Sequence, residues 1–209
     1  MTERPLRERI CLIGKSLFDR RFVVGGAGNI SAREADGRIF ITPTGSNFAR
    51  LVPEEVSEIA ADGTLLSGDK PSKEYPFHRA LYRARPDVGG IVHLHSPYLT
   101  ALSCLRDLDP DNALRAFTPY YVMRIGSLPV VRYYAPGEPR IAEDLEALAR
   151  RTDTRGFLLA SHGPVVVGRT LEEANDNAEE LEETARLFFL LHGENIRYLS
   201  DDEIAQLRK

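Results

Sequence analysis

The feature that most constrains this chain is a short apolar segment that contains two histidines, Ile91-Val92-His93-Leu94-His95. Its apolar residues predict a strand over residues 88–95. Alternate side chains of a strand point to the same face, so His93 and His95 would lie about 6.6 Å apart on one side of a sheet. Two imidazoles at that spacing can bind one ion. The alternative is a histidine pair that faces solvent on an edge strand.

Two further residues complete a candidate ligand set. Glu74 opens a helix predicted from about Lys73 to Arg85, and His162 lies in the turn Ser161-His162-Gly163-Pro164, which joins two short strands predicted within residues 157–168. Three imidazoles and a carboxylate suit zinc or a similar divalent ion, and a carboxylate that leaves the metal opens a position for substrate. On its own, Glu74 would be read as an acidic residue that complements the helix dipole.

Length and cysteine content suggest a single domain over residues 1–209 that folds without disulfides. Cys11 and Cys104 are far apart, form no CxxC pattern and sit in apolar helical contexts typical of buried structural thiols. The chain begins Met-Thr-Glu-Arg-Pro, without an apolar leader, and contains no run of about 18 apolar residues. We expect a soluble cytoplasmic protein that does not associate with membranes.

The charge balance argues against nucleic acid as a partner. The formal net charge is −4 at pH 7, so the overall field does not attract a polyanion. If the substrate is anionic, the site itself must supply positive character.

Helices and strands follow one another along the chain, which predicts a layered α/β fold. Residues 106–129 have no clear period and contain three prolines, so they are a candidate substrate lid. A capping box at Ser200 predicts a short final helix. The other expected helices are 5–20, 96–104, 139–151 and 171–192 (ending at Gly193), and the other expected strands are 38–42, 64–66 and 130–134.

Three short segments could bind a phosphate group. Gly28-Asn29 ends a glycine run that lacks the GxGxxG spacing of dinucleotide sites. Thr44-Gly45 lies in a hydroxyl-rich turn, and Ser72-Lys73 lies at a predicted helix N-terminus with Ser72 as its cap, where free N–H groups attract anions. The alternative is that all three are ordinary turns.

The remaining histidines and the paired tyrosines have simpler interpretations. His78 is expected on a helix surface, with the alternative that it is drawn into the site because it lies one turn after Glu74. His192 is expected to complement the end of the long helix. Tyr120, Tyr121, Tyr133 and Tyr134 are mostly expected to pack with satisfied hydroxyl groups. A tyrosine within residues 106–129 could instead donate a proton.

Taken together, these motifs resemble those of the class II aldolase/adducin family over roughly residues 5–195. The resemblance is carried, in order, by Gly28-Asn29-Ile30-Ser31, Thr44-Gly45-Ser46, Ser72-Lys73-Glu74, His93-Leu94-His95 and Ser161-His162-Gly163. It implies a central mixed, largely antiparallel sheet flanked by helices. It also implies a homotetramer with active sites near subunit boundaries.

The resemblance also implies roles for the site residues. His93, His95 and His162 would bind Zn²⁺, and Glu74 would be a fourth ligand that leaves the metal to act as acid or base. The substrate phosphate would be held by Gly28, Asn29, Thr44, Gly45, Ser72 and Lys73. The aldolases have serine where this chain has Lys73, so either its backbone amide serves or its ammonium group changes the site.

Within that family, residues 68–74 and 118–123 look most like the decarboxylases that act on 3-oxo-tetronate 4-phosphate, a four-carbon sugar-acid derivative. Tyr120 would then be the proton donor, although the adjacent Tyr121 leaves that assignment open by one position. One alternative is an aldolase that cleaves a ketose 1-phosphate such as fuculose or rhamnulose phosphate. Another is an interaction module like the adducin head, which lacks the metal ligands.

Overall fold

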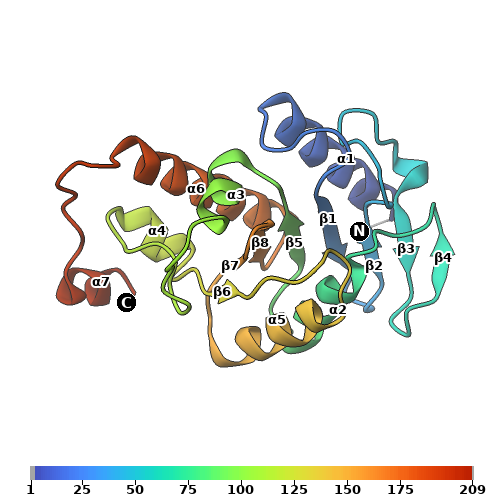
Figure 1. The fold of residues 1–209 in the computed structure, drawn as a ribbon. Helices are drawn as coiled ribbons and strands as arrows, with labels where there is room; N and C mark the ends of the chain where they lie inside the picture. Colours follow the sequence, from blue (N-terminus) through green and yellow to red (C-terminus); the bar gives the residue numbers. More distant parts are fainter. Residues whose placement is uncertain (1–2, 209) are drawn as a thin grey trace.

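Residues 3–208 are described by the computed structural model, in which one sheet is covered by helices on both faces (Figure 1). The sheet has eight strands in the order β4-β3-β2-β1-β5-β8-β7-β6. Every neighbouring pair is antiparallel except β6 and β7, which are parallel and connected through helix α5. The predicted mixed, largely antiparallel sheet is therefore confirmed. The strands are β1 (Asn29–Arg33), β2 (Ile39–Ile41), β3 (Ser57–Ile59), β4 (Leu65–Ser67), β5 (Gly90–His93), β6 (Val130–Val131), β7 (Gly156–Leu159) and β8 (Gly163–Gly168).

The helices form two layers, with α1, α3 and α6 on one face of the sheet and α2 and α5 on the other (Figure 1). Helix α4 packs beside α6 and α7. The helices are α1 (Glu3–Asp19), the 3-10 turn η1 (Pro53–Glu55), α2 (Tyr75–Ala84), α3 (Pro97–Ser103), α4 (Pro119–Arg124), α5 (Arg140–Arg151), α6 (Leu171–Leu190) and α7 (Asp201–Leu207).

Two hydrophobic cores form because the central strands bury both faces. In β5, Val92 packs in the core with α1 and α6, whereas its neighbour Ile91 packs in the core with α2 and α5. Leu158 and Phe157 of β7 divide between the two cores in the same way. Complete burial of such a side chain contributes roughly 1.5–3 kcal/mol, so the centre of the sheet is a rigid base for a site.

Strand β1 and strand β3 were not predicted. Strand β1 directly follows the glycine run. Its residues Asn29 and Ser31 are polar although both are buried, so the strand lacks the alternation of apolar and polar residues by which strands are recognised. Strand β3 carries a buried acidic residue, Glu58, which forms ion pairs with Arg7 and Arg38. A carboxylate at a buried strand position is not recognisable from the local pattern, because its partners lie on distant segments.

Several predicted boundaries were wrong. Residues 106–129 contain helix α4, for which Thr118 is the N-cap. The strand at residues 130–134 ends after Val131, and the long helix ends at Leu190, before Gly193. Cys104 is exposed and Cys11 partly buried, so the expectation of two buried thiols was wrong. The capping box of Ser200 with Glu203 is confirmed.

Across residues 3–208, no helix combines the length and apolar character that crossing a lipid bilayer would require.

Candidate metal centre

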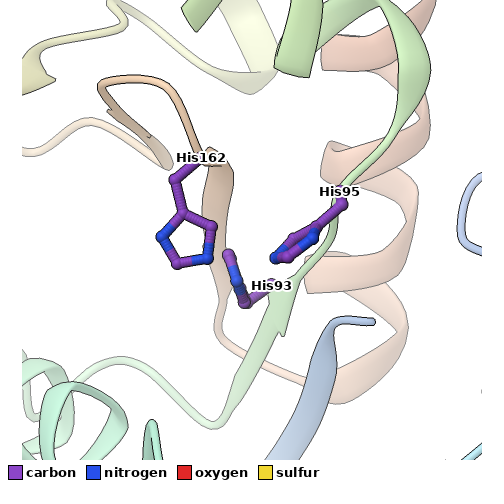
Figure 2. Close-up of side chains that lie close together, drawn as sticks. All are labelled: His93, His95 and His162. Carbon is purple, nitrogen blue, oxygen red and sulfur yellow. The ribbon is translucent and has the colours of Figure 1, made fainter. Parts of the chain in front are cut away.

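Three histidine rings meet at the end of the central strand (Figure 2). His93 is the last residue of β5, His95 follows it in the loop before α3, and His162 lies in the turn between β7 and β8. The ring centroids are 5.2 Å apart for His93 and His95, 4.9 Å for His93 and His162, and 4.7 Å for His95 and His162. The predicted strand over 88–95 was too long, so strand alternation does not place His95. The loop turns its ring toward the other two.

The nitrogens of these rings suit a divalent metal ion. Each of the three histidines offers one ligand nitrogen, and these nitrogens all lie within 4.8 Å of one another. His93 is fully buried, and its Nδ1 donates a hydrogen bond of 2.8 Å to the carbonyl oxygen of Pro164. Its Nε2 then carries a lone pair and has no hydrogen-bond partner. A buried imidazole with one nitrogen held by a carbonyl and the other left bare is arranged as a metal ligand.

Glu74 lies beside this cluster. Its Oε2 is 3.3 Å from Nε2 of His93, and its Oε1 is 3.4 Å from Nε2 of His162. Burial raises the pKa of the Glu74 carboxyl, but His93 and His162, when these rings are protonated, and the Asn29 amide together lower it more, so the net pKa then lies well below the ordinary value. The carboxylate is therefore available as a fourth ligand or as a base.

Glu74 reaches this position because helix α2 begins later than predicted. The helix starts at Tyr75, and Glu74 occupies the N-cap position without a capping bond from its side chain. Ser72 is not the N-cap, but its Oγ accepts a hydrogen bond of 3.2 Å from the backbone N–H of Glu74. The side chain of Glu74 is thus free to face the histidines.

Close backbone contacts hold the ligand-bearing segments together. Gly28 has a φ of +78°, and a Cβ there would lie 2.7 Å from the carbonyl oxygen of His93. At Gly163, next to His162, a Cβ would lie 2.4 Å from the carbonyl oxygen of Leu94. Only glycine permits this close approach at both positions. This explains why the motifs Gly28-Asn29-Ile30-Ser31 and Ser161-His162-Gly163 contain glycine there.

Helix α3 connects the loop of His95 with the turn of His162. The backbone N–H of Ser161 donates to the carbonyl oxygen of Ser103 at 2.8 Å. At the other end of α3, the buried carboxylate of Glu182 accepts hydrogen bonds from the Ser96 hydroxyl at 2.6 Å and from the backbone N–H groups of Tyr98 at 2.8 Å and Leu99 at 3.0 Å. Glu182, on α6, therefore fixes the chain immediately after His95.

Replacing Glu182 with glutamine is expected to lower the free energy of unfolding by about 1.5–3 kcal/mol. The substitution removes a buried carboxylate that accepts several hydrogen bonds. It also places an amide N–H₂ group, which is a donor, against backbone N–H groups that are donors too. Metal affinity should fall with it, because the His95 loop loosens. Urea unfolding and metal titration measure the two effects. The matched control is Glu183→Gln, at an exposed carboxylate that pairs with Arg186, and it should change stability by no more than about 0.5 kcal/mol. Equal behaviour of the two variants would contradict this role.

The metal-free protein is expected to lose stability as the pH falls from about 6.5 to about 4. Burial, followed by the neighbouring His93, lowers the pKa of His95 to about 4 and that of His162 to about 4. An unfolded histidine has a pKa of about 6.5, so in this window the unfolded chain binds protons that the folded chain does not. Denaturant unfolding in a chelator at several pH values measures the slope. In the double variant His95→Gln/His162→Gln, the free energy of unfolding should depend less steeply on pH. An unchanged slope would show that His95 and His162 do not cause the pH dependence.

The segments predicted to bind phosphate converge near this cluster. A Cβ at Gly26 would lie 3.0 Å from the carbonyl oxygen of Gly45, so the glycine run and the Thr44-Gly45 turn are in contact. The backbone N–H of Thr44 donates to the carbonyl oxygen of Lys70 at 3.0 Å, and a β-bridge joins Pro43 to Pro71. These contacts bring the turn beside the segment that leads to Ser72.

A cavity of about 490 Å³ opens at the Thr44-Gly45 turn. Arg50 and Lys70 line it, together with the acidic residues Glu55 and Asp69. Within residues 3–208, Arg50, Lys70 and the exposed Lys73 form no ion pair with another side chain. Arg50 and Lys70 were not identified from the sequence, because no local pattern distinguishes them from ordinary surface cations.

The side chains of Asn29 and His78 are both buried, in contrast to what the sequence motifs suggested. Asn29 is 3% exposed, and its amide contacts Glu74 and His78 within the protein. His78 was expected on the helix surface, but it is fully buried and that prediction was wrong. Its partners are on strand β1, which the sequence analysis missed.

The two adjacent tyrosines on α4 differ sharply. Tyr120 is 60% exposed, whereas Tyr121 is fully buried. The Tyr121 hydroxyl donates to Oδ1 of Asn112 at 2.7 Å. Within residues 3–208, neither tyrosine forms a hydrogen bond or ring contact with the three histidines.

Comparison with known proteins places this chain in a family. The model of the class II aldolase and adducin N-terminal domain matches residues 8–189. The chain therefore belongs to the class II aldolase/adducin family, as its motifs predicted.

Individual relatives agree with this assignment. The chain is 54% identical over 207 residues to a 3-oxo-tetronate 4-phosphate decarboxylase of Haemophilus influenzae, covering 99% of this chain and 98% of that protein. It is 33% identical over 184 residues to an L-fuculose phosphate aldolase of Methanocaldococcus jannaschii, covering 88% and 96%. The crystal structure of YgbL from Escherichia coli superposes with a TM-score of 0.96 at 54% identity, covering 99% of each chain.

Proposed function

We propose that this protein is a zinc-dependent decarboxylase that converts 3-oxo-tetronate 4-phosphate to dihydroxyacetone phosphate and carbon dioxide. The observation that carries the proposal is the 54% identity to the Haemophilus influenzae decarboxylase over 99% of the chain. The histidine cluster with its bare, buried nitrogen supports the metal requirement. Three imidazole nitrogens with a carboxylate favour zinc among the divalent ions.

The substrate chemistry suits these residues. The ketone at C3 is β to the carboxylate, so when the C1–C2 bond breaks, its electron pair forms an enediolate across C2 and C3 and carbon dioxide leaves. His93, His95 and His162 would hold a divalent ion, which would supply Lewis-acid stabilisation of this negative charge. Glu74 accepts the proton of the C2 hydroxyl as the bond breaks and returns it to that oxygen. Tyr120 delivers its hydroxyl proton to C2, which completes dihydroxyacetone phosphate, and regains a proton from water.

The phosphate would be held away from the breaking bond by three backbone segments. We assign Gly28 and Asn29 through their backbone, Thr44 through its hydroxyl group, Gly45 through its amide, and Ser72 and Lys73 at the start of α2. The contacts between the glycine run, the Thr44-Gly45 turn and the Lys70 segment support a common anion site. Fixing a remote group orients the reacting carbon atoms.

We further propose a cytoplasmic homotetramer with active sites at subunit boundaries. The exposed Tyr120 supports this arrangement, because within residues 3–208 it forms no hydrogen bond or ring contact with the three histidines and would reach a site in an assembly. Among the other exposed apolar side chains are Met123 on the same helix and Leu190 and Leu191 at the end of α6. The proposed partner is a small phosphorylated sugar acid, without nucleic acid or membrane.

A coupled assay with two substrate types tests the proposed reaction. Purified protein loaded with zinc is expected to release carbon dioxide and triose phosphate from 3-oxo-tetronate 4-phosphate, without an aldehyde. The alternative, supported by the relative at 33% identity, is a ketose 1-phosphate aldolase. Aldehyde release from fuculose or rhamnulose phosphate, without turnover of the oxo acid, would establish that alternative. If the purified protein contains no stoichiometric metal, that result would support the third hypothesis, an interaction module like the adducin head.

A further inference from the structure

A buried chain of polar groups continues behind Glu74. The Nδ2 of Asn29 donates to Oε2 of Glu74 at 2.7 Å, and the Oδ1 of Asn29 contacts Nε2 of His78. The Nδ1 of His78 lies 2.8 Å from the Ser31 hydroxyl, and that hydroxyl lies 2.8 Å from the hydroxyl of Tyr82. These hydrogen bonds could not be predicted from the amino-acid sequence, because they join two elements, β1 and α2, that are distant in the sequence.

The proton positions along this series of hydrogen bonds follow from the ionised carboxylate of Glu74, where the series begins. An ionised carboxylate only accepts hydrogen bonds, so Asn29 must turn its N–H₂ group toward Glu74 and its carbonyl oxygen toward His78. That oxygen also only accepts, so His78 must carry a proton on Nε2. With Nδ1 unprotonated, the hydroxyl of Ser31 donates to it, and the hydroxyl of Tyr82 donates to Ser31. Every group then has a partner of the correct kind.

His78 is suited to hold this order. It is fully buried, and its ring stacks on Phe77 with 4.8 Å between the centroids. Burial, followed by the neighbouring His93, lowers the pKa of His78 to about 3, so the ring is neutral at pH 7 and has a single ring proton. A neutral ring with a fixed acceptor on one side and a fixed donor on the other has one tautomer that satisfies both.

We propose that His78 is a positioning residue for the reaction. It fixes the Asn29 amide, and through that amide it holds Glu74 at the gap between His93 and His162. If the amide turned over, its carbonyl oxygen would face the carboxylate, and the repulsion between the two acceptors would displace Glu74. The inference rests on the role of Glu74 in the proposed function and adds a residue that does not touch metal or substrate.

Two substitutions separate positioning from packing. In His78→Gln the amide nitrogen lies near the place of Nε2, so a donor toward Asn29 is kept. In His78→Asn the shorter side chain reaches only the place of Nδ1 beside Ser31, so the donor toward Asn29 is lost. We expect kcat to fall about 10- to 100-fold in His78→Asn, the usual range for residues behind metal ligands, with KM changed less than about threefold. In His78→Gln, kcat should stay within about threefold of the wild type.

Two measurements do not depend on turnover. In the Co²⁺-substituted proteins, the visible absorption bands should shift in His78→Asn and match the wild type in His78→Gln. In the metal-free wild type, ¹⁵N-histidine NMR should show the His78 proton on Nε2, with the ring signal assigned through the backbone resonances of residue 78 in uniformly labelled protein. A proton on Nδ1 would overturn the proposal, and so would equal impairment of both variants at equal thermal stability.

The NMR measurement also covers the case in which neither variant folds, because it uses the wild-type protein. Failure of the proposed function is recognised separately. If the wild type releases no carbon dioxide from the oxo acid, the decarboxylase assignment fails, while the cobalt spectra and the tautomer still decide whether His78 orients Asn29.

Discussion

Replacing His93 with alanine is expected to remove both metal and activity while the protein remains folded. His93 supplies the one ligand nitrogen that is completely buried and bare, at the end of the central strand. Activity should fall by more than about 100-fold, the upper range for residues that act only behind the ligands. Metal content by mass spectrometry, circular dichroism and turnover measure the three outcomes.

The matched control is His192→Ala. His192 is exposed just beyond the end of α6, so this variant should keep its metal and its activity. Added zinc should also raise the thermal midpoint of the control but not that of His93→Ala, because only a folded state that binds the ion is stabilised by it. Stoichiometric zinc and full turnover in His93→Ala would remove His93 from the site.

Replacing Tyr120 with phenylalanine is expected to lower kcat by about 10²- to 10⁴-fold, the usual contribution of a positioned proton donor. Stability should be unchanged, because the Tyr120 side chain is 60% exposed and its hydroxyl makes no hydrogen bond within the described part of the chain. The effect should appear in kcat more than in KM, because the hydroxyl is needed when the proton reaches C2. Turnover with the oxo-acid phosphate and thermal unfolding are the measurements.

Tyr121→Phe is the control, and it should show the opposite pattern. It removes the hydrogen bond to Asn112, for a loss of about 0.5–1.5 kcal/mol of stability, and leaves kcat near the wild-type value. Burial raises the pKa of the Tyr121 hydroxyl, which makes it a poorer proton donor. If Tyr121→Phe lost activity and Tyr120→Phe did not, the proton donor would be the other member of the pair.

The parts of the fold that the sequence predicted are those with a local signal. Helix α5 was recognisable because Ile141, Leu145 and Leu148 recur on one face and are buried together. The short strands around His162 were recognisable from apolar runs that flank a glycine turn. Strands β1 and β3 lacked such a signal, because their buried polar residues are satisfied by partners that are distant in the chain.

The site divides in the same way. The three histidines and Glu74 were found from motif and residue type, and the structure brings them together. The buried position of His78 could not be predicted, because its partners are on strand β1, which itself was not recognised. One signal was present: His78 is four residues after Glu74, one helical turn along the same face.

The strand order of the sheet has a consequence for how the protein matures. Strand β5 lies between β1, which leads to the half formed by β2, β3 and β4, and β8, which leads to the half formed by β7 and β6. His93 ends β5, His95 follows it and His162 comes just before β8, so a growing polypeptide cannot bring the three rings together until β8 has paired with β5. A cation that binds all three rings would stabilise fully folded molecules over partly assembled ones, and the cellular supply of that cation would then influence how much of the protein survives proteolysis.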